Sequence, residues 1–315
     1  MSVVVTGGAG FIGANLCRRL AADGETVVAV DDLSTGYASN LADIEAVLVE
    51  GTILDPDLLD RALRNATAVV HLAARPSVPR SLADPVASHL ANATGTVEVL
   101  EAARRAGNVH VIVASSSSVY GANPTLPKHE DLATRPLSPY AASKLATEAY
   151  ALAYQSSFGL PVLAFRFFNV FGPLQPAGHA YAAVVPAFID AALDGKELVV
   201  HGDGLQTRDF TFVDTVVEVI ADALDRQVTC PEPVNLAFGT RTDLMSLIGL
   251  LEEVVGNPLA VEHTDPRAGD VRHSQADSTH LLELFPDVVP TPLPDALRAT
   301  VDWFVAEQER APHAG

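Results

Sequence analysis

The 315-residue sequence predicts an α/β protein, with a doubly wound parallel sheet followed by a smaller α/β region. Three observations predict this architecture. Short apolar segments alternate with helix-like segments through the first half of the chain, which is typical of a parallel sheet covered by helices on both faces. A glycine-rich turn over 7–13 follows the first apolar segment, and an acidic pair follows the second. The pattern changes after Asn169, where Gly and Pro become frequent and a second domain is expected.

Six strands are predicted in the first half from their apolar composition, at residues 2–6, 25–30, 46–49, 68–72, 109–114 and 161–167. Helices are predicted from apolar residues that recur at helical spacing, at 14–22, 57–64, 86–106 and 140–156. In an open α/β sheet, ligands bind beyond the carboxyl ends of the strands. We therefore expect one site where those ends meet, formed by Gly7, Asp31, Ala73, Ser116 and Asn169.

The glycine-rich turn lies between a predicted strand and a predicted helix, as in a Rossmann-type dinucleotide-binding fold. Gly7 permits the tight turn, Gly10 permits close approach of a pyrophosphate, and Gly13 permits the helix to pack on the strand. The free N–H groups at the start of the helix would bind the phosphates. Asp31 follows at about the distance expected of the acid that binds the adenosine ribose, and the adjacent Asp32 would help to repel a 2′-phosphate. These residues favour NAD over NADP.

The second half predicts helices at 182–194, 214–224, 242–255 and 294–306, and strands at 198–201, 209–213 and 234–237. The strand at 234–237 is expected to be the last of the main sheet. Two domains follow from this reading. They are an NAD-binding domain at 1–168, with its sheet completed by roughly 209–237, and a substrate-binding domain made of 169–208 and 238–315.

A serine, a tyrosine and a lysine carry the predicted chemistry. Tyr140 and Lys144 stand one turn apart on a predicted helix, and Ser116 ends a predicted strand. A tyrosine has a pKa of about 10, and lowering it to about 7 would require roughly 4 kcal/mol from the lysine ammonium and the positive nicotinamide ring. The phenolate could then remove a hydroxyl proton while a hydride leaves the same carbon. Ser116 would bind that oxygen, and Ser118 would share its side of the strand.

Charge and composition exclude several classes of function. The chain has 20 basic and 39 acidic residues, a formal net charge of -19, which would repel nucleic acid and anionic membranes. No apolar run reaches the roughly 18 residues of a membrane-spanning helix, and the opening strand leaves no signal peptide to be expected. Cys17 and Cys230 form no disulfide framework, and the ten histidines show no metal-binding spacing. We expect a cytoplasmic protein without a metal.

The motifs TGGAGFIG, SSSSVYG, PYAASK, RFFNVFGP and GDGLQTRDFTFVDTV resemble those of the extended short-chain dehydrogenases/reductases, and within them the UDP-hexose 4-epimerases. The resemblance runs from Ser2 to about Ala306 and is closest to the UDP-N-acetylglucosamine 4-epimerase branch. It implies tightly bound NAD and a UDP-sugar substrate. It also implies that Tyr140 takes the 4-OH proton and NAD takes the C4 hydride. The 4-keto sugar would then turn over, and the hydride would return to its opposite face.

The resemblance implies binding roles for individual residues. Besides Tyr140 and Lys144, it assigns the cofactor site to Gly7, Gly10, Phe11, Ile12, Gly13, Asp31, Asp32, Ser34, Thr35, Gly36, Thr52, Ile53, Leu72, Ala73, Ala74, Asn92, Ser115 and Phe167. It assigns the substrate site to Ser117, Ser118, Asn169, Ala183, Val184, Val200, His201, Arg208, Arg267, Asp270 and Ser274. Arg208 and Arg267 would bind the diphosphate. Thr52 replaces the usual aspartate and would weaken one adenine contact.

Two details bear on the reaction and the substrate. Ser117 and Ser118 occupy the places where the related dehydratases and decarboxylases carry an acid, which favours an epimerase. Ser274 falls where a tyrosine restricts the family's pocket to glucose and galactose and a small residue admits an N-acetyl group. An N-acetylated hexose is therefore expected to fit.

Other functions stay open at this level. The nearest alternative is a UDP-glucuronate 4-epimerase or a nucleotide-sugar dehydratase of the same superfamily. A carboxylated substrate would need an extra cation near the sugar C6, and the sequence identifies none. A net oxidoreductase that releases NADH and a non-catalytic nucleotide-sugar binder belong to other classes, and the intact Ser116, Tyr140 and Lys144 argue against the binder. The helices at 86–106 and 140–156 resemble the pair that forms the superfamily's dimer interface, so a homodimer is expected.

Overall fold

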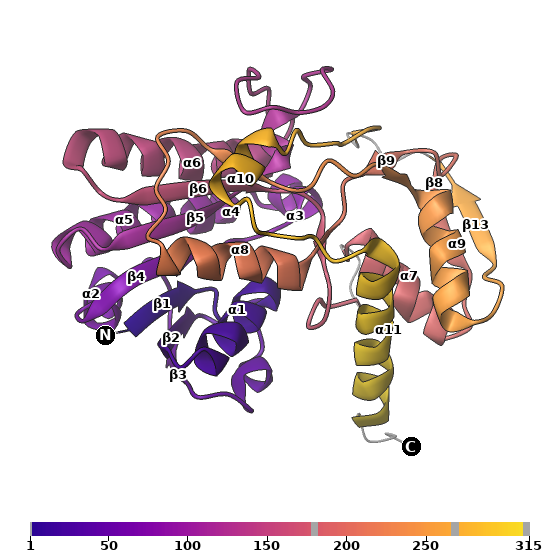
Figure 1. Ribbon diagram of the computed structural model, residues 1–315, viewed down its shortest axis with the longest axis horizontal. Helices are drawn as coiled ribbons and strands as arrows, with labels where there is room; N and C mark the ends of the chain where they lie inside the picture. Colours follow the sequence, from indigo (N-terminus) through magenta and orange to yellow (C-terminus); the bar gives the residue numbers. More distant parts are fainter. Residues whose placement is uncertain (1, 178–181, 266–270, 311–315) are drawn as a thin grey trace.

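The structure is a computed structural model that describes residues 2–177, 182–265 and 271–310. Its centre is a seven-stranded sheet in which neighbouring strands are parallel, in the order β11-β6-β5-β4-β1-β2-β3. The strands are β1 (Ser2–Thr6), β2 (Thr26–Asp31), β3 (Ala46–Glu50), β4 (Ala66–His71), β5 (His110–Ser116), β6 (Val162–Phe167) and β11 (Val234–Leu236). The chain runs from β1 to one edge and then crosses back to β4 on the other side of β1 (Figure 1). The predicted doubly wound α/β fold is therefore confirmed.

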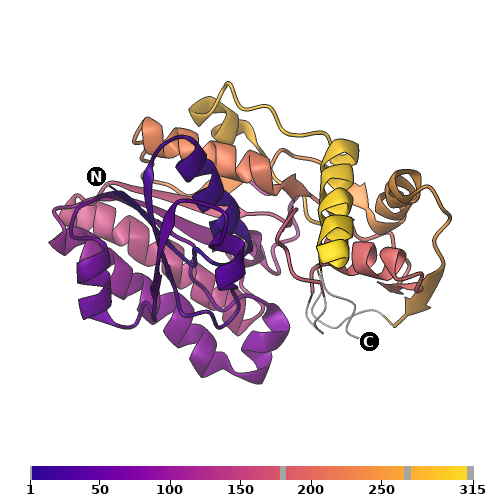
Figure 2. The same ribbon diagram turned by 90° about the horizontal axis from the view of Figure 1, so that it is seen from below.

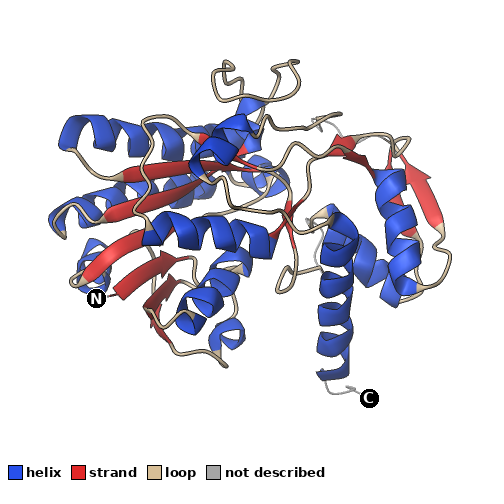
Figure 3. Ribbon diagram, viewed as in Figure 1, coloured by secondary structure: helices blue, strands red, loops and turns tan. Residues whose placement is uncertain are grey.

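Helices cover both faces of this sheet (Figure 3). One face carries α1 (Phe11–Ala22) and α8 (Val213–Asp225), and the other carries α2 (Pro56–Ala62), α5 (Gly95–Arg105) and α6 (Pro139–Phe158). Alternate side chains of a strand point to opposite faces. Val3 and Val5 accordingly lie in the buried cluster of the first face, and Val4 lies in that of the second. Burial on both sides explains why the strands read as continuous apolar runs.

The helix predicted at 86–106 is interrupted. The chain forms α3 (Val78–Ala83) and α4 (Pro85–His89), then a π-helical segment Leu90–Thr94, and then α5. The backbone carbonyl of Asn92 accepts hydrogen bonds from the hydroxyls of Thr96, at 2.5 Å, and Thr147, at 2.9 Å. Side-chain donors at this carbonyl accompany the wider π turn, which is common at functional sites.

A smaller part follows beyond the carboxyl ends of the main strands (Figures 1 and 2). It contains β8 (Leu198–His201) paired in parallel with β13 (Val261–Thr264), and three mutually packed helices, α7 (Val184–Leu193), α9 (Leu244–Val255) and α11 (Leu293–Arg310). The helix α10 (Thr279–Leu284) packs instead on β11 of the main sheet. The helices predicted at 182–194 and 294–306 correspond to α7 and α11.

Two predictions for the second half need correction. The strand predicted at 209–213 does not join the main sheet. Only β10 (Thr211–Phe212) forms there, and it pairs with β7 (Val170–Phe171). The segment just before it, β9 (Thr207–Arg208), pairs with β12 (Thr242–Asp243), so the helix predicted from 242 starts two residues later, as α9. These short pairs join distant segments, and a local pattern does not reveal them.

The segment at 234–237 does complete the sheet, because β11 pairs in parallel with β6. No helix among the described residues has the length and apolar character needed to cross a membrane.

Candidate active site

A cavity of about 930 Å³ lies at the carboxyl ends of the main strands. Gly7, Asp31, Ala73, Ser116 and Asn169, which lie at or just beyond the ends of five strands, all line it. The structure therefore brings together the five strand ends expected to form one site. The volume is near the upper end of the range for small-molecule sites, about 300–1,000 Å³.

The glycine turn forms one end of this cavity and fits the phosphates of a dinucleotide. Gly7 has φ +71°, and a Cβ there would lie 2.7 Å from the backbone nitrogen of Ala73. A Cβ on Gly13 would lie 2.1 Å from the carbonyl oxygen of Gly7, so the helix packs against the turn only without a side chain. Gly10 precedes α1, which has no side-chain cap and no acidic residue in its first turn. Its first N–H groups are therefore left for an anion.

Asp31 supports the same turn from the end of β2. Its Oδ2 accepts the N–H of Ala9 at 2.9 Å, and its Oδ1 accepts that of Leu33 at 2.8 Å. Burial raises the pKa of this carboxyl, and the two N–H donors oppose that effect. Asp31 thus ties the glycine turn to β2, in addition to the ribose contact that the sequence predicts.

The other predicted cofactor residues mostly lie along the same cavity. It is lined by Gly7, Gly10, Phe11, Ile12, Gly13, Asp31, Asp32, Ser34, Thr35, Thr52, Ile53, Leu72, Ala73, Ala74, Ser115, Tyr140, Lys144 and Phe167. Gly36 and Asn92 are not in the lining. A Cβ on Gly36 would lie 2.7 Å from the backbone carbon of Ala9, so this residue lets the chain approach the glycine turn.

Asn92 has a supporting position behind the cavity. Its Oδ1 accepts the backbone N–H of Arg75 at 2.7 Å, and its Nδ2 donates to the hydroxyl of Ser143 at 2.9 Å. The side chain is buried, with an exposed fraction of 1%. It therefore joins the turn after β4 to α6, the helix that carries the predicted catalytic residues.

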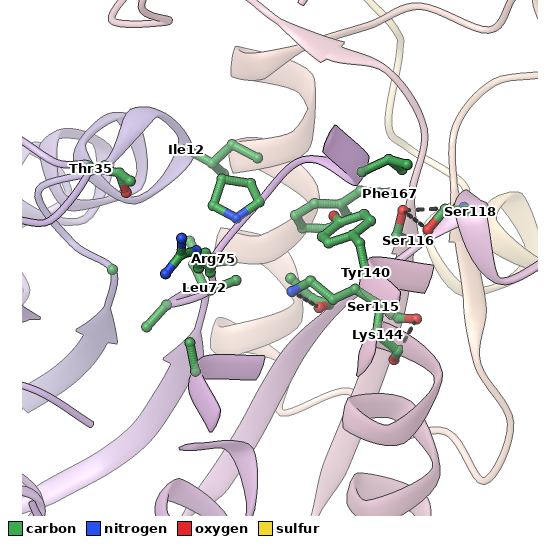
Figure 4. Close-up of a pocket in the computed structure, with 18 of the residues that line it drawn as sticks. Ile12, Thr35, Leu72, Arg75, Ser115, Ser116, Ser118, Tyr140, Lys144 and Phe167 are labelled. Carbon is green, nitrogen blue, oxygen red and sulfur yellow. Dashed lines mark hydrogen bonds between the residues drawn. The ribbon is translucent and has the colours of Figure 1, made fainter. Parts of the chain in front are cut away.

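The consecutive serines have different environments, and Figure 4 shows three of them, Ser115, Ser116 and Ser118. Ser116 ends β5, and Ser117–Tyr120 forms a 3₁₀ turn. The hydroxyl of Ser118 donates to that of Ser116 at 2.9 Å. The two side chains meet because the chain turns here, and strand alternation, the predicted reason, is wrong. Ser115 points elsewhere, since its hydroxyl donates to the carboxylate of Glu148 at 2.9 Å.

Tyr140 and Lys144 lie one turn apart at the start of α6, which Ser138 caps by accepting the N–H of Ala141. Lys144 Nζ donates to the carbonyl of Ala114 at 2.9 Å, and burial lowers the pKa of this lysine to about 8. Burial also raises the pKa of Tyr140, opposed by a hydrogen bond with Ser116. In the protein alone, desolvation of the phenolate dominates. The lowering of the tyrosine pKa by the lysine together with the nicotinamide ring stays a prediction for the complex with NAD.

Only some of the predicted substrate-binding residues line the cavity. Ser117, Ser118, Asn169, Arg208 and Ser274 line the cavity, whereas Ala183, Val184, Val200 and His201 do not. Val200 is fully buried in the core, and His201 contacts the hydroxyl of Thr264 through Nδ1 at 2.8 Å. Arg267 and Asp270 lie outside the described residues.

Sequence reasoning missed other residues of the lining. Among them are Lys128, Leu137, Ser138, Gln175, Val271 and His273. Ser138 and His273 adjoin motifs that were recognised, so proximity in the chain was a usable signal. Lys128 lies in a loop without a motif. Among the described residues, no group of three or more His, Cys, Asp or Glu side chains is placed to hold a metal.

A Rossmann-type sheet whose glycine turn shares a cavity with serine, tyrosine and lysine defines a short-chain dehydrogenase/reductase. The particular group follows from comparison with known proteins. The NAD dependent epimerase/dehydratase family matches residues 3–237, and this chain belongs to that family. NAD is accordingly its cofactor, and the glycine turn and Asp31 fit it.

Individual relatives are similar over nearly the whole chain. The UDP-glucose 4-epimerase of Mycolicibacterium smegmatis is 39% identical over 310 residues, which cover 96% of this chain and 98% of that protein. The UDP-N-acetylglucosamine 4-epimerase from Methanobrevibacter ruminantium, solved with UDP-N-acetylmuramic acid, has TM-score 0.92 and 36% identity over 97% of this chain and 98% of its own. The UDP-glucose 4-epimerase from Thermotoga maritima, solved with UDP-glucose, has TM-score 0.92 and 34% identity over 98% of this chain and 100% of its own.

Proposed function

We propose that this protein is an NAD-dependent epimerase that inverts C4 of a UDP-hexose through a transient 4-keto sugar. The observation that supports it most is that Ser116, Tyr140 and Lys144 line one cavity together with the glycine turn. When bound, NAD supplies the hydride acceptor and donor. The residues of the chain then have to orient the sugar and move one proton at its 4-oxygen.

Tyr140 is the group placed to move that proton. Tyr140 is half-buried in the cavity wall, and desolvation raises the pKa of its hydroxyl against the opposing effect of a hydrogen bond with Ser116, which favours the protonated form before ligands bind. The positive charge of the oxidised cofactor, added to that of Lys144, would favour the phenolate once both ligands are in place. Ser116, already in contact with Ser118, would hydrogen-bond the reacting sugar oxygen.

The charge of the lining supports an epimerase over a dehydratase. Among the described residues of the cavity, the carboxylates are Asp31 and Asp32, which belong to the end that holds the glycine turn. Ser117 and Ser118 provide hydroxyls at the other end, where elimination of water would need a general acid.

The substrate proposed first is UDP-N-acetylglucosamine, UDP-glucose or both, with the corresponding galacto sugars as products. Ser274 supports the N-acetyl sugar, because this small side chain lines the cavity and its backbone N–H is held by the carbonyl of Thr207 at 3.1 Å. UDP-glucuronate is the second candidate, and the buried Lys128 in the same cavity favours it.

Domain roles and assembly are also part of this proposal. The parts at 169–208 and 238–315 would bind the nucleotide sugar. The helices over 86–106 and 140–156 would form a homodimer, since they present Val86 and Tyr150 to solvent with exposed fractions of 66% and 47%. A cytoplasmic location is consistent with the two cysteines, which are both free.

Incubation of the purified protein with UDP-N-acetylglucosamine, UDP-glucose and UDP-glucuronate, each alone and without added cofactor, tests the proposal. Anomeric NMR signals would follow the products, and absorbance would follow NADH. An equilibrium mixture of C4 epimers without net NADH is expected. A product lighter by one water, or NADH formed in proportion to oxidised sugar, would overturn the assignment.

A further inference from the structure

Lys128 is a buried lysine in the wall of the cavity. Its exposed fraction is 4%, although it belongs to the loop between the serine turn and α6. Its Nζ donates to the backbone carbonyl of Asn123. No carboxylate pairs with it among the described residues, and burial is the one cause of its lowered pKa. Two of the three N–H donors of the ammonium thus lack a protein acceptor there.

The backbone at Lys128 is held in place by segments distant in the chain. Its N–H donates to the carbonyl of Gln275 at 2.8 Å, and its carbonyl accepts the N–H of Asp277 at 2.7 Å. Asn235 of β11 donates to the same carbonyl at 2.8 Å. The lysine is therefore anchored beside Ser274, which lines the same cavity.

A buried cation without an anion is unfavourable, because desolvation of an ammonium costs several kcal/mol unless a partner offsets it. The fold provides such a partner elsewhere. Arg166, with an exposed fraction of 3%, pairs with Glu148 at 2.6 Å. Lys128 is buried to a similar degree and has only a carbonyl. A ligand that brings an anion into the cavity would complete its surroundings.

The neighbours of Lys128 indicate which part of the ligand that is. The serine turn and Gly121, which precede the loop, line the cavity, as does Ser274, whose neighbour Gln275 accepts the N–H of Lys128. This is the end where Ser116 and Ser118 would hold the sugar, away from the glycine turn. The anion is therefore a substituent of the hexose rather than a phosphate of the cofactor.

We propose that Lys128 is a specificity-determining residue that binds a carboxylate carried by the hexose of the nucleotide sugar. The inference rests on the proposed function, since it assumes a UDP-sugar in this cavity. It supplies the cation that a carboxylated substrate needs and that the sequence alone did not reveal. The carboxylate could belong to C6, as in a uronate, or to an acidic ether on another ring carbon.

Binding to the Tyr140→Phe protein, which should convert its ligands about 10²- to 10⁴-fold more slowly than the parent, tests the proposal. Calorimetry would compare UDP, UDP-glucose, UDP-glucuronate and UDP-N-acetylmuramate, with and without Lys128→Met. We expect the affinity for a carboxylated sugar, relative to UDP-glucose, to fall by about 10- to 100-fold, because one charge-assisted hydrogen bond is lost. Lys128→Arg should keep most of the preference. The carboxylated sugar that responds identifies the ring position.

The matched control is Lys196→Met, since this exposed lysine pairs with Asp194 and does not line the cavity. In this control variant, the ratio of the affinity for a carboxylated sugar to the affinity for UDP-glucose should equal the ratio in the parent. If Lys128→Met lowered the affinity for UDP-glucose and for the carboxylated sugars equally, Lys128 would have a structural role and the proposal would be overturned. A lower affinity for UDP alone would lead to the same conclusion.

Failure of the two proposals can be told apart. A Lys128-dependent preference in a wild-type protein that makes no epimer would refute the epimerase and leave the carboxylate site standing. Epimerisation by a protein that shows no Lys128-dependent preference for a carboxylated sugar would refute the carboxylate site and leave the epimerase standing.

Discussion

At the scale of single residues, burial shifts the pKa values of the proposed catalytic pair, Tyr140 and Lys144, before any ligand binds. Lys144 has an exposed fraction of 5% and a pKa lowered to about 8, and burial raises the pKa of Tyr140. A desolvated tyrosine next to a desolvated lysine is not a ready base. The positive charge of the bound cofactor would therefore be a condition for proton removal, which couples cofactor binding to catalysis.

Replacement Tyr140→Phe should lower the epimerisation rate by about 10²- to 10⁴-fold, the usual contribution of a general acid–base group. The ring fills the same space, so bound NAD should be retained, as measured by its absorbance after denaturation. Anomeric NMR would give the rate. A variant within about tenfold of the parent would refute the role of the hydroxyl.

His71 makes stability depend on pH. Its Nδ1 lies 2.7 Å from the hydroxyl of Thr6, its Nε2 lies 3.1 Å from that of Thr96, and burial lowers its pKa to about 3. In the unfolded chain a histidine has a pKa of about 6.5, so the unfolded state binds the proton first as pH falls. The stabilisation is therefore complete above about pH 6.5 and lost progressively toward pH 3.

The variant His71→Gln should lack this part of the pH dependence. Urea unfolding of both proteins between pH 7 and pH 4 would give the free energies of unfolding. As the pH falls, we expect the free energy of unfolding of the wild type to decrease by up to about 1.4 kcal/mol per pH unit more than that of the variant. Parallel curves would show that His71 is not buried in its neutral form.

At the scale of elements, a buried ion pair joins α6 to β6. Arg166 Nη2 lies 2.6 Å from Glu148 Oε1, with side-chain exposed fractions of 4% and 5%. Ser115 donates to the same carboxylate, and Arg166 also donates to the hydroxyl of Tyr120 at 2.8 Å. This network holds the helix that carries Tyr140 against the strands that end at the cavity.

Removing both partners of this pair should cost less than the sum of removing each alone. The single change Glu148→Leu leaves the guanidinium buried without a counter-charge, and we expect a loss of about 3–5 kcal/mol in the free energy of unfolding. Combining Glu148→Leu with Arg166→Met should cost less than the sum of the two single changes. A urea double-mutant cycle measures this coupling, and additive losses would contradict it.

At the scale of the whole molecule, the chain is acidic, but the described lining of its cavity has more basic than acidic side chains. The formal net charge is -19, yet the described lining contains Arg75, Lys128, Lys144 and Arg208 against Asp31 and Asp32. Local cations therefore offset the repulsion that the rest of the chain exerts on an anionic nucleotide. Because this lining comes from the sheet and from the smaller part, an anionic ligand should stabilise the molecule as a unit.

We expect UDP at about 100 times its Kd to stabilise the folded protein by about 2.7 kcal/mol, seen as a rise in Tm. Arg208→Ala should show a clearly smaller rise at the same UDP concentration, because a charge-assisted contact to the diphosphate is lost. Arg310→Ala, a change at an exposed arginine near the end of α11, is the matched control. Equal shifts in all three proteins would exclude Arg208 from the diphosphate site.

Much of the fold could be predicted from the sequence, because its signals are local. Strand composition, helical spacing and the glycine turn each depend on residues within one turn or one strand, and the sheet follows from their alternation. Even so, the π-helical segment Leu90–Thr94 escaped prediction. Its Asn92 carbonyl accepts a hydrogen bond from Thr147 of another helix, a contact that no local pattern encodes.

The strands and helices of the sheet, the expected NAD site and the candidates for catalysis could thus be predicted, since each depends on residues that are close together in the chain. The folded chain was needed to show that Ser118 contacts Ser116 through a turn, that Asn92 lies behind the cavity, and that Lys128 lines it. The position of Lys128 depends on its backbone hydrogen bonds to Gln275 and Asp277. Those partners are brought beside it by the folded chain, and no spacing along the sequence encodes such a contact.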